Sequence, residues 1–215
     1  MLTDNLYLNT IMIFLGAFLV GSLPTAYIAG RIKGIDISRS GNKNVGGTNA
    51  LFILGKPLGI TVIIIDIGKG LLAVWLASLF SDHHQFIPML AVVFTTIGHN
   101  WMFPIKFKGG KGTGVLAGSL IYLSPLSIPV LFLVFIPVTS FMVKDSFLGV
   151  GIGLLLFSFL MWAWEGSYYW CLFLILITIV YSLRCLNLYI TYFTDKRRYL
   201  NPFVRMILKP FLRQR

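Results

Sequence analysis

The sequence has little charge. Only 12% of its 215 residues are charged, while 57% are hydrophobic, and the mean hydropathy is +0.83. A soluble domain usually has about a quarter of its residues charged, so this chain has too little polar surface to cover a globule in water. The composition excludes an ordinary soluble protein and predicts an integral membrane protein.

Cysteine, acidic residues and N-terminal basic residues are also scarce. The two cysteines, Cys171 and Cys185, lack a CxxC or Cys/His partner, which argues against a disulfide framework and a zinc site. The few acidic residues are scattered, so neither a metal site nor a cofactor is predicted. Residues 1–10 contain no Lys or Arg, so we expect a retained first helix rather than a cleavable signal peptide.

Long hydrophobic runs are what the chain has instead. A spanning helix needs roughly 20 mostly apolar residues. The candidate spans cover approximately residues 6–32, 57–80, 86–104, 113–123, 126–143, 146–164 and 168–184. The short fourth span could join the fifth through a bend at Ser124 and Pro125, which would leave six helices. The predicted fold class is an all-α integral membrane protein with seven transmembrane helices in a single domain, residues 1–215.

The basic residues predict the orientation. The chain has 18 Lys and Arg against 7 Asp and Glu, a net charge of +11. With seven spans, nearly all basic residues fall on one side, in the loops 33–56 and 105–112 and near the C-terminus. Because basic loops face the cytoplasm, we expect the N-terminus outside and the C-terminus in the cytoplasm. The six-helix alternative would mix the charges.

The C-terminal tail, residues 186–215, mixes Lys and Arg with large apolar residues. This pattern is typical of a short helix lying in the membrane interface, or of a basic tail that only sets topology. The positive charge suits anionic headgroups or phosphorylated substrates. Nucleic acid is not an expected partner, because no basic face lies on a soluble module.

Two polar loops on the predicted cytoplasmic side could bind anions. Residues 34–49, GIDISRSGNKNVGGTN, are rich in Asn and Gly, which tolerate backbone conformations that turn N–H groups toward one point. Residues 107–114, FKGGKGTG, place glycines and Lys111 directly before a predicted helix, whose N-terminus attracts anions. The spacing differs from a Walker A loop, so nucleotide hydrolysis is not indicated. The alternatives are an ordinary surface turn and a flexible basic turn.

Ionisable residues inside a predicted span also indicate function. Asp66 and Lys69 are three residues apart, so they share one helix face and can pair. Charges in a membrane helix are costly, and by default they indicate a functional site. His99 and Asn100 end the third predicted span just before the glycine-rich loop, where His99 could act as a base or as a hydrogen-bonded structural residue.

Several of these segments resemble the PlsY family of bacterial membrane acyltransferases. The resemblance rests on GSLPTAYIAGRIKGIDI, the NVGGTN region, IIDIGKG and GHNWMFPIKFKGGKG, which follow one another over residues 20–115. The family has seven transmembrane helices and a cytoplasmic active site, and it moves a fatty acyl group from acyl phosphate to glycerol 3-phosphate. The resemblance therefore implies the same fold that the hydropathy and charge predict.

The resemblance also implies residue roles. The donor phosphate is expected at Thr48, Gly109, Gly110 and Gly112. The expected catalytic residues are Lys111, Asn187 and Arg184, with Asp66, Lys69 and His99 in support. The acceptor is expected at Asn42, Lys43, Asn44 and Asn49. This chain departs from the family pattern where Asn42 replaces a Ser, Phe52 an Arg, Arg184 a His and Ile190 an Arg. Lys43 and Arg184 are hypothesised to compensate.

The expected function is acyl transfer from acyl phosphate to glycerol 3-phosphate, which gives lysophosphatidic acid for phospholipid synthesis. The expected partners are these two substrates and membrane lipids, at the bacterial inner (cytoplasmic) membrane. Two alternatives remain open: a paralogue with the same donor and another acceptor, and a non-catalytic lipid-binding membrane protein. A transporter is least favoured, because no inverted repeat is visible.

Overall fold

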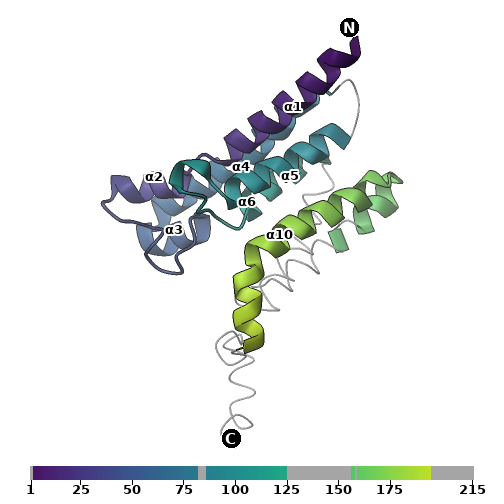
Figure 1. The fold of residues 1–215 in the computed structure, drawn as a ribbon. Helices are drawn as coiled ribbons and strands as arrows, with labels where there is room; N and C mark the ends of the chain where they lie inside the picture. The colour runs from purple at the N-terminus through teal and green to yellow at the C-terminus, as the bar shows by residue number, and fades with distance from the viewer. Residues whose placement is uncertain (1, 82–85, 125–155, 158, 195–215) are drawn as a thin grey trace, which may run out of the picture. The chain divides into compact units, whose positions relative to one another are not determined.

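The computed structural model of the chain describes residues 2–81, 86–124, 156–157 and 159–194 (Figure 1). Within these residues every named element is helical. The chain divides into two compact units, Met1–Ser127 and Ile128–Arg215.

The first unit contains six α-helices and a short 3-10 helix among its described residues. They are α1 (Leu2–Gly21), α2 (Thr25–Ile32), α3 (Gly47–Leu54), α4 (Lys56–Leu79), α5 (Phe86–Asn100), η1 (Phe103–Ile105) and α6 (Thr113–Leu123). In the second unit, α10 covers Tyr169–Thr194, and residues 156–157 and 159–165 are also helical.

Helix α4 lies at the centre of the first unit. It packs against α1, α5 and α6 along its length and against α2 and α3. Figure 1 shows α1, α5 and α6 running alongside α4, with α2 and α3 gathered at the end away from the N-terminus. The polar loops before α3 and before α6 therefore belong to one end of the bundle.

Glycines allow the helices to approach closely. A Cβ atom on Gly70 of α4 would overlap the carbonyl of Val115 on α6, and one on Gly118 of α6 would overlap the carbonyl of Ile67 on α4. Small residues at helix contacts let backbones meet in membrane bundles. The contact between α4 and α6 consequently has no room for side chains at these positions.

The polar end of the unit has an apolar core of its own. Buried residues of α2, α3, α4 and the loop between α2 and α3 form one cluster: Ala26, Ala29, Ile37, Val45, Ala50, Leu54 and Val62. Ile37 is fully buried although it lies in the polar loop. This core holds α3 and its loop against the bundle.

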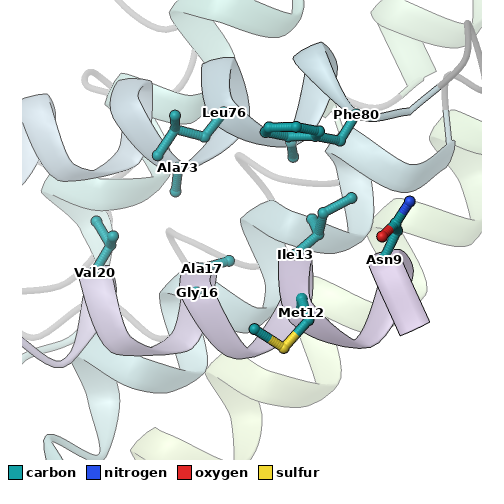
Figure 2. Close-up of a pocket in the computed structure, with 10 residues that line it drawn as sticks. Asn9, Met12, Ile13, Gly16, Ala17, Val20, Ala73, Leu76 and Phe80 are labelled. Atoms are coloured by element: carbon teal, nitrogen blue, oxygen red, sulfur yellow. The ribbon is translucent and has the colours of Figure 1, made fainter. Parts of the chain in front are cut away.

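An apolar cavity of about 300 Å³ lies between α1 and α4 (Figure 2). Small residues from both helices line it, including Gly16 and Ala17 of α1 and Ala73 and Ala77 of α4. Among the described residues that line it, only Asn9 has a polar side chain. The cavity is therefore unsuited to charged chemistry, which belongs to the polar end.

The first predicted span is interrupted in the structure. It was predicted as one helix over residues 6–32, and that continuity is wrong, because α1 ends at Gly21 and α2 begins at Thr25. Pro24 explains the break, since proline disfavours a helical conformation in the residue before it and cannot donate a backbone hydrogen bond. The loop predicted over residues 33–56 likewise contains a helix, α3.

For the other predicted spans that the structure describes, the first residue of the helix lies within one residue of the predicted start. Helix α6 has the predicted limits, and α4 differs from its prediction by one residue at each end. Helix α5 ends at Asn100 instead of residue 104, because Pro104 follows within a tight turn. Helix α10 continues past the predicted end at residue 184 to Thr194, since neither Gly nor Pro interrupts that stretch.

Within the described residues, two stretches are long and apolar enough to cross a membrane, Tyr7–Ile32 and Lys56–Leu79. Shorter apolar helices are Phe86–Asn100, Thr113–Leu123 and Tyr169–Arg184. The predicted fifth span, most of the sixth, and residues 195–215 of the tail lie outside the described residues. Seven spans and the orientation of the termini therefore stay predictions.

Candidate active site

The two predicted polar loops meet. The glycine loop, residues 109–112, follows α5 and a turn closed by a backbone hydrogen bond from Met102 to Lys108 (3.1 Å). The N–H of Val45, in the loop before α3, donates to the carbonyl of Gly109 at 3.2 Å. The N–H of Gly110 donates to the carbonyl of His99, the penultimate residue of α5, at 3.0 Å. Segments more than 60 positions apart in the chain thus form one site.

Glycine is required at each glycine position in this loop. A Cβ on Gly109 would overlap the backbone carbonyls of His99 and Asn100, and one on Gly110 would overlap the His99 imidazole. Gly112 has φ +77°, a left-handed conformation, and a Cβ there would lie 2.7 Å from Thr96 Cγ2. The loop is therefore pressed onto the end of α5, with its backbone held in one conformation.

Two helix N-termini lie at this junction. Helix α6 begins after Gly112 and α3 begins after Gly46, and neither helix has a side-chain hydrogen bond at its N-cap. A Cβ on Gly46 would lie 3.7 Å from Gly110 Cα, so the two loops are in contact there. The first N–H groups of a helix have no partner within the helix, and together with its dipole they attract anions. The arrangement can hold two anionic groups close together.

Asn100 is a site residue that the sequence analysis left without a role. It is fully buried, and its Oδ1 lies 2.9 Å from where a Cβ on Gly112 would be. Neither its Oδ1 nor its Nδ2 has a hydrogen-bond partner among the described residues. A buried amide is normally hydrogen-bonded, so its place beside the start of α6 marks it as a candidate ligand group. Its position at the polar end of an apolar stretch, seven residues before the glycine-rich segment 107–114, is the signal that the sequence offers.

Asn49 organises the loop before α3. Its side chain is buried, and its Nδ2 lies within hydrogen-bond distance of the carbonyls of Ile37 (3.3 Å), Ser40 (3.0 Å) and Asn44 (2.9 Å). Its Oδ1 accepts from the N–H of Asn42 at 3.2 Å. All its polar atoms are used within the loop, so Asn49 shapes the loop from inside.

The remaining predicted residues of this loop lie nearer its surface. Asn42, Lys43 and Thr48 are exposed, and Asn44 is half-buried. The N–H of Asn44 donates to the side chain of Asn42 at 3.0 Å, a turn that brings Asn44 toward Gly46. Lys43 has φ +63°, and its side chain is available at the surface. These residues surround the N-terminus of α3.

The start of the loop is held by Asp36. Its carboxylate accepts from the Ser38 hydroxyl at 2.7 Å and from the Ser38 N–H at 3.0 Å. The hydrogen bond from the Ser38 side chain, with smaller contributions from Arg31 and Arg39, lowers the pKa of Asp36. Asp36 therefore stays ionised at neutral pH and keeps this turn closed.

A buried polar cluster lies at the same end of the bundle. Asp66 and Lys69 of α4 are 3% and 4% exposed, and Lys69 Nζ lies 2.8 Å from Asp66 Oδ1. Thr25 donates to Asp66 at 2.7 Å, and Lys69 donates to the carbonyl of Leu23 at 2.7 Å. The predicted pair of Asp66 and Lys69 thus exists, and its hydrogen bonds connect α4 to the segment between α1 and α2. Buried charges need such partners.

The other predicted catalytic residues are distributed over both units. Lys111 is half-buried within the glycine loop of the first unit. Arg184 is half-buried on α10 in the second unit, and the side chain of Asn187, on the same helix, lies outside the described residues. Phe52, where the family pattern has Arg, is 78% exposed on α3. In the part of the chain that the structure describes, no group of three His, Cys, Asp or Glu residues could share a metal ion.

Comparison with known proteins decides the family. The family described as glycerol-3-phosphate acyltransferase matches residues 11–191. This chain belongs to the glycerol-3-phosphate acyltransferase family. It is therefore an enzyme of the acyltransferase class, which confirms the family predicted from the sequence motifs.

Individual relatives agree with this assignment. Glycerol-3-phosphate acyltransferase 2 of Dehalococcoides mccartyi is 40% identical over 168 residues, covering 76% of this chain and 77% of the relative. Glycerol-3-phosphate acyltransferase of Bacillus subtilis is 42% identical over 149 residues, covering 66% of this chain and 75% of the relative.

Solved structures share the fold. Crystal structures of PlsY (YgiH), an integral membrane glycerol 3-phosphate acyltransferase, in a glycerol 3-phosphate form and a lysophosphatidic acid form, match with a TM-score of 0.73. The identity is 23%, and the match covers 86% of this chain and 92% of PlsY. The helices in the described part of this family member thus follow the fold of PlsY, which is an integral membrane protein.

Proposed function

We propose that this protein transfers a fatty acyl group from acyl phosphate to a hydroxyl of glycerol 3-phosphate, giving lysophosphatidic acid for phospholipid synthesis. The site faces the cytoplasm from the bacterial inner membrane, as the distribution of basic residues predicts. The observation that carries the proposal is the junction of two uncapped helix N-termini on loops joined by a hydrogen bond from Val45 to Gly109. Both substrates carry a phosphate, and this junction offers a place for each.

The donor phosphate is assigned to the glycine loop and the start of α6. Only glycine fits at Gly109, Gly110 and Gly112, so the loop backbone lies directly against the end of α5. This leads the chain into α6, whose first N–H groups are offered to a phosphate. Lys111 adds a full positive charge, and the Asn100 amide lies beside the first turn of α6. Thr48, exposed in the first turn of α3, is within the same junction and is assigned to the donor as well.

The acceptor is assigned to the loop before α3. Asn42 and Asn44 present amides there, Lys43 presents a charge, and Asn49 keeps the loop in shape. Phe52 cannot make the bidentate phosphate contact that Arg makes. The cation opposite the glycerol phosphate is therefore assigned to Lys43. The acceptor roles of Arg184 and Asn187, which belong to the second unit, rest on the family pattern alone.

The reaction is a direct transfer. The hydroxyl oxygen of glycerol 3-phosphate attacks the carbonyl carbon of acyl phosphate, and the bond between that carbon and the phosphate oxygen breaks. Inorganic phosphate leaves with the bonding electrons, and the proton from the hydroxyl is taken up by a phosphate oxygen. The protein holds the partners together and stabilises the departing charge with loop N–H groups and Lys111. No covalent acyl-enzyme is needed.

The variant K111A tests the donor assignment. Removal of the one full charge in the glycine loop should lower formation of lysophosphatidic acid from palmitoyl phosphate and glycerol 3-phosphate by about 100-fold or more, because charge stabilisation of this kind contributes such factors. Product is measured with purified protein in detergent. Lys108 is the matched control, since it is an exposed lysine three positions earlier in the same connection, and K108A should keep near-normal turnover. Normal turnover by K111A would remove Lys111 from the donor site.

A further inference from the structure

We propose that His99 is a positioning residue for the donor phosphate. It supports the glycine loop at Gly110, and the charge of the Asp66 carboxylate, at 3.9 Å and thus beyond hydrogen-bond distance, favours the orientation of its ring. This inference rests on the proposed function, because it specifies how the donor half of that site is held in shape.

The imidazole of His99 lies between the glycine loop and the buried polar cluster. The side chain is 3% exposed, and its Nδ1 is 3.9 Å from Asp66 Oδ1. The opposite edge of the ring faces Gly110: a Cβ there would overlap Nε2 and would lie 2.8 Å from Cδ2. The ring therefore fills the space beneath Gly110. Because the ring lies between Gly110 and Asp66, a shift of α4 would displace the glycine loop.

His99 holds the loop in two ways. Its backbone carbonyl accepts the hydrogen bond from the Gly110 N–H at 3.0 Å, and its ring packs under the same residue. A side-chain substitution removes only the second contact. The effect of such a substitution on the loop can therefore be separated from loss of the helix end itself.

Asp66 is itself fixed, which makes it suited to orient the ring. Thr25 from α2 and Lys69 from the next turn of α4 both contact its Oδ1, at 2.7 and 2.8 Å. A Cβ on Gly114, in the first turn of α6, would lie 3.1 Å from Asp66 Cβ. Asp66 thus abuts both His99 and the helix whose N-terminus receives the donor phosphate.

Loss of the His99 ring should impair binding of the donor, acyl phosphate, more than binding of the acceptor. Without the ring, Gly110 loses its support and the loop N–H groups move from the positions that the phosphate needs. The α3 side of the site touches the glycine loop at Val45 and Gly46, but it has its own supports in Asn49 and the apolar cluster around Ile37. The KM for acyl phosphate should therefore change much more than the KM for glycerol 3-phosphate.

The test measures both KM values for the full-length protein in detergent with palmitoyl phosphate. We expect H99A to raise the KM for palmitoyl phosphate about tenfold or more, because small displacements of binding groups are costly, and to change the KM for glycerol 3-phosphate less than about twofold. D66N, which keeps the side-chain shape, should change the same KM in the same direction. Because D66N also removes the charge opposite the buried Lys69, it should lower the unfolding midpoint by itself. The KM for palmitoyl phosphate should nevertheless change little further when H99A is already present.

A second pair of variants tests the contact itself. G110A should lower kcat/KM strongly, because the added Cβ collides with the His99 ring. In the double variant G110A/H99A the collision is gone, and the next atom, the Val45 carbonyl oxygen at 3.1 Å, needs only a small shift. The double variant should be no less active than H99A alone. Additive losses would overturn the proposal.

The remaining outcomes are distinguishable. Equal changes in both KM values, or a fall in kcat alone, would mean that His99 has a general structural role and would overturn the inference. If H99A does not fold, D66N and the G110A pair with H99Q in place of H99A give the same comparison. Failure of the wild-type protein to turn over palmitoyl phosphate would contradict the proposed function itself, whereas wild-type turnover with an unaffected H99A contradicts only this inference.

Discussion

At the residue scale, Asn49 shows how one amide can determine a loop. Its side chain is 2% exposed and contacts three carbonyls and one N–H of residues that precede it. Removing it takes a partner from each of these backbone groups, although the carbonyls of Ile37 and Ser40 still accept from the N–H groups of Ser40 and Lys43. The lost hydrogen bonds and the emptied buried position both destabilise the loop. We therefore expect Asn49 to affect activity indirectly, by stabilising the conformation of the loop.

The variant N49A should destabilise the protein by about 2–3 kcal/mol, since several hydrogen bonds of roughly 1 kcal/mol each are lost. Thermal unfolding in detergent measures the effect, as a midpoint lowered by several degrees. N42A is the control, because Asn42 is exposed and its side chain makes one local hydrogen bond, to Asn44. Equal midpoints for N49A and wild type would contradict the organising role.

At the element scale, the contact between α4 and α6 places the donor loop. Helix α6 begins directly after the glycine loop, and Gly70 and Gly118 allow its backbone to touch that of α4. The same α4 carries Asp66 and Lys69. A change in the distance between these helices therefore moves the N-terminus that receives the phosphate.

The variant G70A tests this coupling. Its Cβ would overlap the Val115 carbonyl and lie 2.9 Å from the Ser119 N, so we expect a lower unfolding midpoint and a raised KM for acyl phosphate. G68A is a matched control on the same helix, because a Cβ there meets nothing within 4 Å. Alanine favours a helix over glycine by up to about 1 kcal/mol, so G68A should be neutral or slightly stabilising. Equal behaviour of the two variants would exclude a close contact at Gly70.

The sequence predicted most helices in the first unit but not their interruptions. Hydropathy identified α4, α5 and α6 because each is a continuous apolar stretch. It missed the break at Pro24, since the residues on both sides are apolar, and it missed α3, which is short and lies in a polar loop. Short helices of this kind form through tertiary packing, here through Ala50 and Leu54.

At the whole-molecule scale, the motifs were sufficient to predict the family, and the family match confirmed it. They were not sufficient to predict which residues touch. These contacts depend on how α4 and α5 pack. Examples are the hydrogen bond from Val45 to Gly109 and the place of His99 between Asp66 and Gly110. Asn100 was passed over for the same reason, because only the fold shows that its amide is buried beside Gly112.

The departures from the family pattern concern the acceptor. Phe52 is exposed on α3, where a guanidinium is expected in the family, and Arg184 is on α10 in the other unit. The donor side, in contrast, keeps every glycine and Lys111. Whether glycerol 3-phosphate is the acceptor is thus the point on which the whole account depends.

The most direct measurement is release of phosphate from palmitoyl phosphate by the purified wild-type protein, with and without glycerol 3-phosphate, together with detection of the lipid product. We expect release that depends on glycerol 3-phosphate, with one lysophosphatidic acid formed for each phosphate. Saturable binding of palmitoyl phosphate without release, or release that glycerol 3-phosphate does not change, would contradict it.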